Sequence, residues 1–250
     1  MTEGPTGAIV SAEPLALPHE PLPREIAQSL YIVIAAFNEA KAIGEVVREL
    51  LPLYPNVVVV DDGSRDETCE RAHEAGAMVL RHVVNRGQGA ALQTGISYAL
   101  KRGAPFVVTF DADGQHRPED IPALVLPIAR GEVEFCLGSR FLEHGDKVPF
   151  GRRMVLFGAI VFTRITSGMR LSDAHNGFRA FSRRAAEHID LHLDRMAHAS
   201  EIIDQLRASE LPYKEVPVFI RYTAYSMAKG QRGSAAFRVA FDYLIGRVLR

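Results

Sequence analysis

Short apolar runs alternate with helical patterns over the first half of the chain. Runs rich in β-branched residues predict strands at 30–36, 57–60, 77–80, 106–110 and 133–137. The stretches between them predict helices at 43–51, from Ser64 onward, at 87–100 and at 118–130. Strands that are apolar throughout and alternate with helices indicate an α/β fold. We therefore expect a mostly parallel, Rossmann-like sheet with helices on both faces.

Two of the predicted helices carry start signals. Ser64 is followed three residues later by Glu67, the spacing of a capping box. Pro118 suits the first turn of a helix, where its missing N–H costs nothing.

The two ends of the chain differ in pattern from its centre. Residues 1–28 hold several prolines among small residues, which predicts a flexible N-terminal tail. The folded domain is expected over 29–228, followed by an amphipathic segment at 229–250. Within that segment, 235–250 has an apolar stripe opposite arginines, which suits a membrane interface, the domain core or a second subunit.

Composition narrows the class of protein. The 250 residues are 47% hydrophobic and 24% charged, with a net charge of -1. These values exclude wholesale disorder and give no basic excess for binding nucleic acid. Cys69 and Cys136 are far apart and are expected to be buried thiols, which fits a cytoplasmic location. No apolar run reaches the roughly 18 residues of a membrane-spanning helix.

Polar residues follow three of the predicted strands. They are Asn38-Glu39, Asp61-Asp62 and Asp111 with Asp113. Because ligands bind at the carboxyl ends of strands in such sheets, these clusters predict one site.

The segment Asp111-Ala-Asp113-Gly-Gln115 suits a divalent cation. Alternate residues of an extended chain point the same way, so Asp111, Asp113 and Gln115 can converge. Carboxylate and amide oxygens favour Mg²⁺ or Mn²⁺, and a diphosphate would complete the coordination. The alternative is a turn in which an Asp caps a helix.

Two further motifs suit a nucleotide. Asp61 can accept a hydrogen bond from a base N–H, and Asp62 one from a ribose hydroxyl; helix capping is the alternative for one of them. The turn Asn85-Arg-Gly-Gln-Gly-Ala90 opens a helix, where the backbone at Gly87 can approach a ligand and Arg86 can contact phosphate.

The ordered set of motifs resembles the family 2 glycosyltransferases, in the branch of the polyprenyl-phosphate and dolichyl-phosphate mannose synthases. The motifs are Ile34-Ala-Ala-Phe-Asn-Glu39, Val59-Val-Asp-Asp-Gly-Ser64, Gly87-Gln-Gly-Ala90, Asp111-Ala-Asp-Gly-Gln-His116, Gly138-Ser-Arg140 and Asn176-Gly-Phe-Arg179. The resemblance implies a GT-A fold, a UDP-, GDP- or dTDP-linked sugar donor, a divalent metal and inversion at the anomeric carbon.

The resemblance also implies roles for individual residues. The nucleotide-sugar site would comprise Ala35, Phe37, Asn38, Glu39, Asp61, Asp62, Arg86, Gly87, Asp111 and Ala112. Asp113 and Gln115 would hold the metal, with Asp111 close by. Asn176, which replaces the usual Ser, would bind the acceptor together with Arg140 and Arg179; a surface salt bridge is the alternative for each arginine.

The acceptor decides whether a catalytic base is needed. A polyprenyl phosphate is already anionic near neutrality and needs only cations such as Arg140 to position it. A sugar hydroxyl would instead need a carboxylate, for which Asp173 and Glu201 are the candidates.

We expect the lipid-phosphate acceptor, in assembly of bacterial cell-surface glycans. Contact with the cytoplasmic face of the plasma membrane and homo-oligomers both stay open. A non-catalytic subunit that binds nucleotide-sugars is a further alternative.

Overall fold

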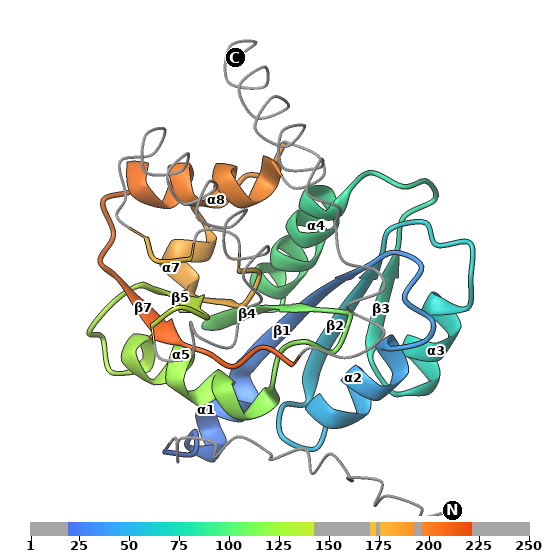
Figure 1. The fold of residues 1–250 in the computed structure, drawn as a ribbon, viewed down its shortest axis with the longest axis horizontal. Coiled ribbons are helices and arrows are strands. Elements are labelled where there is room, and N and C mark those ends of the chain that lie inside the picture. The colour runs from blue at the N-terminus through green and yellow to red at the C-terminus, as the bar shows by residue number, and fades with distance from the viewer. Residues whose placement is uncertain (1–19, 143–170, 174–175, 193–196, 222–250) are drawn as a thin grey trace, which may run out of the picture.

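The computed structural model describes residues 20–142, 171–173, 176–192 and 197–221 (Figure 1). Its strands are β1 (Leu30–Ala36), β2 (Asn56–Asp61), β3 (Met78–Arg81), β4 (Phe106–Asp111), β5 (Phe135–Ser139), β6 (Arg179–Ser182) and β7 (Tyr213–Pro217). Its helices are α1 (Arg24–Ser29), α2 (Ile43–Leu50), α3 (Thr68–Glu74), α4 (Gln88–Lys101), the 3₁₀ turn η1 (Pro118–Asp120), α5 (Ile121–Ala129), α7 (Arg183–Ala186) and α8 (Ala197–Ala208).

The described strands form one mixed sheet in the order β3-β2-β1-β4-β6-β5-β7. Neighbouring strands from β3 to β4 are parallel, and β7 runs parallel to β5. Among these strands only β6 is antiparallel to its neighbours, β4 and β5. The mostly parallel α/β sheet predicted from the sequence is therefore confirmed.

Helices cover both faces of this sheet, with α2 and α5 on one face and α4, α7 and α8 on the other (Figure 1). Side chains of β1 alternate accordingly, since Ile32 and Ile34 pack with α2 while Val33 packs with α4. The small residues of α4 allow close contact: a Cβ on Gly95 would lie 2.3 Å from Cγ1 of Val33.

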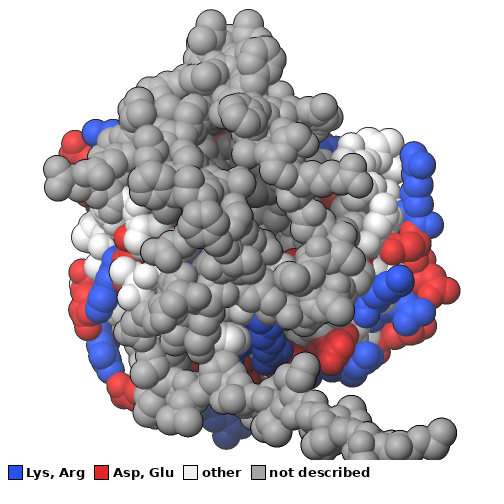
Figure 2. Space-filling view, viewed as in Figure 1, with Lys and Arg blue, Asp and Glu red and all other residues white. Residues whose placement is uncertain are grey.

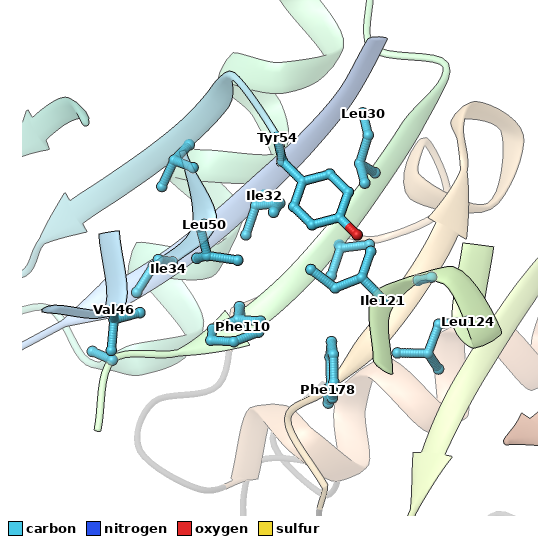
Figure 3. Close-up of a cluster of buried hydrophobic side chains, with 14 of the residues drawn as sticks. Leu30, Ile32, Ile34, Val46, Leu50, Tyr54, Phe110, Ile121, Leu124 and Phe178 are labelled. Carbon is cyan, nitrogen blue, oxygen red and sulfur yellow. The ribbon is translucent and has the colours of Figure 1, made fainter. Parts of the chain in front are cut away.

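The core on the α2 side also anchors the motif that ends in Arg179. Phe178 is fully buried and meets Phe110 of β4 edge-to-face at 5.2 Å, as Figure 3 shows. Because adjacent residues of a strand point to opposite faces, Arg179 projects from the other side of the sheet.

The sequence predictions are wrong at three places. Helix α3 begins at Thr68, because the Ser64 hydroxyl accepts from Asn38 rather than capping a helix. Residues 24–28 of the predicted tail belong to α1, whose Ile26 packs against the core. Cys136 is buried, and burial raises the pKa of its thiol to about 12, but Cys69 is only half-buried.

Other predictions lie outside the described residues, namely the tail over 1–19 and the amphipathic segment 229–250. Among the described residues, no helix is both long and apolar enough to cross a membrane. The charged side chains of the described part are spread around the rim of the face shown in Figure 2, with both signs interspersed.

Candidate active site

Two loops at the carboxyl ends of β1 and β2 are hydrogen-bonded to each other. The backbone N–H of Asn38 donates to Oγ of Ser64 at 2.9 Å, and that of Glu39 to Oγ1 of Thr68 at 2.8 Å. Oδ1 of Asn38 accepts in return from the N–H of Arg65 at 2.9 Å. Asn38 has a φ of 55°, a left-handed conformation that Asn tolerates better than most residues. Asn38 therefore fixes the conformation of the loop after β1, which also contains Phe37 and Glu39.

Asp61 is fully buried at the end of β2. Its Oδ1 accepts from the N–H of Ser64 at 3.0 Å. Among the described residues its Oδ2 has no hydrogen-bond partner, although Nε of Arg81 lies 3.3 Å away as an ion pair. A buried acceptor without a donor is costly unless a ligand supplies one, so this oxygen suits a base N–H.

The carboxylate of Asp62 makes hydrogen bonds within the protein that the sequence did not reveal. Its Oδ1 accepts from the N–H of Arg86 at 2.9 Å and contacts Nδ1 of His82 at 2.7 Å. Its Oδ2 accepts from the N–H of Gly87 at 2.7 Å. Both carboxylate oxygens thus hold the glycine-rich turn before α4, and the ribose contact predicted for Asp62 stays a prediction. Arg86 itself is exposed.

The segment after β4 is a turn, not the extended chain expected from the sequence. Gly114 has a φ of 75°, and the N–H of Gln115 donates to Oδ1 of Asp113 at 3.1 Å. The turn, and not alternation along an extended chain, therefore sets how Asp113 and Gln115 lie relative to each other. The side chain of Ala112 packs in the core, so only its backbone can face a ligand.

The carboxylates at this turn lie close enough to affect each other's ionisation. Burial raises the pKa of Asp111 to about 6, with a further rise from Glu39 and an opposing effect from Arg140 and Arg179. Burial and the neighbouring Asp111 both raise the pKa of Asp113. Such repulsion is relieved when a cation binds between the carboxylates.

The donor set fits a hard divalent cation. The described residues hold no group of three or more His, Cys, Asp or Glu side chains placed to bind a metal. Asp111 and Asp113 could provide two carboxylates and Gln115 an amide oxygen, which would leave positions for a diphosphate and water.

His116 supports Asp111, a role that the sequence did not indicate. Its Nδ1 accepts from the N–H of Asp111 at 3.2 Å, which leaves the proton on Nε2, 3.3 Å from Oδ2 of Asp111. The ring stacks on Phe178 at 4.6 Å, and burial lowers the pKa of His116 to about 4. His116 is therefore a neutral imidazole at physiological pH.

Arg140 and Asp173 form a buried ion pair. Oδ2 of Asp173 accepts from Nε of Arg140 at 2.6 Å and from its backbone N–H at 3.2 Å. Their side chains are 9% and 1% exposed, so the surface salt bridge considered for Arg140 is excluded. This pairing brings together two residues that the sequence placed in different roles.

Arg179 is buried and belongs to the same charge cluster. Its Nε donates to the backbone carbonyl of Asn176 at 3.0 Å. Burial lowers the pKa of Arg179 to about 10, against the opposing effect of Asp111 and Asp173, so it stays charged at neutral pH. Asn176 is also buried, and its Nδ2 has no hydrogen-bond partner within the part of the chain that the structure describes.

Glu201 lies in α8 and is 4% exposed. Its two carboxylate oxygens accept from the N–H of His192 at 3.3 and 3.1 Å. Glu201 therefore ties α8 to His192.

Comparison with known proteins finds a family model and relatives that match this sequence. The family model described as glycosyl transferase family 2 matches residues 31–190. An uncharacterized protein of Methanocaldococcus jannaschii is 39% identical over 88% of this chain and 92% of its own length. A UDP-N-acetylglucosamine–dolichyl-phosphate N-acetylglucosaminyltransferase of Methanococcus voltae is 32% identical over 88% of this chain and 98% of its own.

A solved structure shares the fold. Glucosyl-3-phosphoglycerate synthase of Mycobacterium tuberculosis, in complex with Mn²⁺, UDP-glucose and phosphoglyceric acid, superimposes with a TM-score of 0.64. It is 21% identical and the match covers 90% of this chain and 81% of the synthase. The α/β fold is thus the GT-A fold predicted from the sequence.

Proposed function

This chain belongs to glycosyl transferase family 2 and is a glycosyltransferase. From that premise we propose that it transfers a sugar from a nucleotide-sugar to a polyprenyl phosphate. The transfer would invert the anomeric carbon and use a divalent cation. The observation that carries the proposal is the state of the two carboxylates that a sugar-hydroxyl acceptor would need. Asp173 is paired with Arg140, and Glu201 is buried and accepts from His192.

A general base must reach the proton that it removes. Asp173 is 1% exposed at its side chain, and its Oδ2 already accepts two hydrogen bonds from Arg140. The cations Arg140 and Arg179, which lie near Asp111, suit an acceptor that brings its own negative charge. A phosphate monoester does so, because its second pKa is about 6.

The donor is proposed to lie along the ends of β1, β2 and β4. Oδ2 of Asp61, which accepts no hydrogen bond from the described residues, would accept from an N–H of the base, a contact that uracil, thymine and guanine all offer. The exposed Arg86 would contact phosphate. Asp111, Asp113 and Gln115 would hold Mg²⁺ or Mn²⁺, which when bound neutralises charge on the departing diphosphate.

The relatives agree with a lipid-phosphate acceptor. The Methanococcus voltae protein is named for a dolichyl-phosphate acceptor, and a relative from Mycolicibacterium smegmatis, 29% identical over 85% of this chain and 84% of its own length, is named polyprenol monophosphomannose synthase. These relatives come from archaea and bacteria, so the predicted role in bacterial cell-surface glycans stays a prediction, as does the cytoplasmic face of the membrane.

Two measurements test the proposal. Calorimetry with UDP, GDP and dTDP, each with and without Mn²⁺, should show metal-dependent binding of at least one nucleotide. Labelled sugar from the matching donor should then move to polyprenyl phosphate but not to polyprenol, which has a hydroxyl in place of the phosphate. Transfer to polyprenol, or only to a sugar hydroxyl, would show that the acceptor is wrong.

A further inference from the structure

Glu215 of β7 holds the segment that carries Asp173. Its Oε1 accepts from the N–H of Ser172 at 2.8 Å, from Oγ of Ser172 at 2.8 Å and from the N–H of Asp173 at 3.3 Å. Its Oε2 also lies 3.1 Å from the N–H of Ser172. One half-buried carboxylate therefore fixes the backbone of two consecutive residues that are more than forty positions earlier in the chain.

A second contact ties the same segment to β5. Oγ of Ser139 lies 2.6 Å from Oγ of Ser172. Because Ser172 gives its own hydroxyl proton to Glu215, Ser139 must be the donor to Ser172. Ser139 immediately precedes Arg140, so the network joins both members of the Arg140–Asp173 pair to one end of the sheet.

We propose that Glu215 is a positioning residue, which sets the guanidinium of Arg140 in the site by fixing Ser172 and Asp173. The proposal rests on the role given to Arg140 in the proposed function. Asp173 receives Nε–H of Arg140 at 2.6 Å, so a shift of the Asp173 backbone moves the guanidinium with it.

Glu134 offers a matched control. It is also a half-buried glutamate, it accepts a hydrogen bond from the hydroxyl of Ser182, and it stands just before β5, whereas Glu215 acts at the opposite end of that strand. Loss of its charge should therefore leave Arg140 in place.

The test compares Glu215→Gln with Glu134→Gln in the full chain. The signal of the Arg140 Nε–H group, assigned by its loss in Arg140→Lys, should shift in Glu215→Gln and stay unchanged in Glu134→Gln by ¹⁵N NMR. Turnover with polyprenyl phosphate should fall about tenfold or more in Glu215→Gln, while the dissociation constant of the nucleotide stays near the wild-type value.

A double-mutant cycle separates positioning from general damage. In an Arg140→Lys background, Glu215→Gln should lower turnover by less than about twofold, because its effect passes through Arg140. An unchanged Arg140 signal in Glu215→Gln, or additive losses in the cycle, would overturn the proposal. Absence of wild-type transfer to polyprenyl phosphate would instead refute the acceptor, and the NMR comparison would still decide the role of Glu215.

Discussion

Gly177 lies directly against the carboxylate of Asp111. A Cβ at position 177 would stand 2.6 Å from Oδ1 and 3.0 Å from Oδ2 of Asp111. The carbonyl of Gly177 also accepts from Oγ1 of Thr109 at 2.6 Å, so the backbone at 177 is held to β4 and cannot easily move away. The Asp111 carboxylate can therefore occupy its position only because residue 177 has no side chain.

Gly177→Ala is expected to displace the Asp111 carboxylate and to lower kcat/KM on the order of 10²-fold, the cost of moving a reacting group by about 1 Å. The backbone at 177 does not have a positive φ, so alanine adds a contact and no backbone strain. Steady-state kinetics together with Mn²⁺-dependent nucleotide binding measures the effect.

Gly44→Ala is the control, because a Cβ there would meet only the flexible end of Arg48 at 3.4 Å and a carbonyl at 3.6 Å. This glycine lies in α2, where alanine favours the helix. Equal activity of Gly177→Ala and Gly44→Ala would show that the position of Asp111 does not matter.

Asp113→Ala is expected to abolish metal-dependent nucleotide binding while the protein stays folded. The neighbouring Asp111 raises the pKa of Asp113, so removal of this carboxylate relieves repulsion. The hydrogen bond lost is the one from the N–H of Gln115, and the free energy of unfolding should change by no more than about 1 kcal/mol. Calorimetry with and without Mn²⁺ gives the binding, and urea unfolding gives the stability.

Glu187→Gln serves as its control, because Glu187 forms an exposed ion pair with Arg183. That variant should bind nucleotide with Mn²⁺ as the wild type does. If Asp113→Ala transfers sugar at the wild-type rate, the metal ligands lie elsewhere.

The strands that could be predicted from the sequence are those that coincide with runs of apolar residues. Apolar runs predicted β1 to β5, because each of these strands is built largely from apolar residues. They did not indicate β6 or β7. The four residues of β6 include the buried Arg179, and β7 is an edge strand that begins with exposed residues. Neither segment has an apolar run, and both depend on neighbouring strands for their hydrogen bonds.

The same limit applies to the site. The sequence predicted which strand ends carry the site, because acidic residues follow the apolar runs. It could not show that Asp62 holds the turn at Gly87, or that Asp173 pairs with Arg140, since these contacts join residues 25 and 33 positions apart. Glu215 was missed for the same reason, whereas the contact of His116 with Asp111, only five positions away, depends on the turn between them.

Asp62→Asn is expected to destabilise the protein by about 1 to 3 kcal/mol, the cost of leaving a buried donor unpaired. An amide presents an N–H group where Asp62 now accepts from Arg86 and Gly87, so the turn before α4 should loosen. Nucleotide affinity should fall together with stability. Urea unfolding and calorimetry measure the two effects.

Thr94→Val is the comparison for that change, because Oγ1 of Thr94 contacts Nε2 of His82 at 3.0 Å without touching Asp62. It should cost about 1 kcal/mol and leave nucleotide affinity near the wild-type value. An Asp62→Asn protein that binds nucleotide normally would show that the turn does not contribute to the donor site.

Glu201→Gln separates the two acceptor chemistries. If the acceptor is a phosphate, transfer needs no base, and turnover should stay within a few-fold of the wild type, whereas loss of a general base would cost roughly 10²- to 10⁴-fold. The substituted amide would still offer an oxygen to the N–H of His192, so this contact should be kept. Melting temperatures of the two proteins check this.

The pH dependence gives an independent reading of the same question. Transfer to a phosphate should fall as pH drops below about 6, where the second ionisation of the acceptor is lost, and this profile should be the same in Glu201→Gln and wild type. A Glu201→Gln protein that keeps its melting temperature but loses turnover by about 10²-fold or more would identify Glu201 as the base and the acceptor as a hydroxyl.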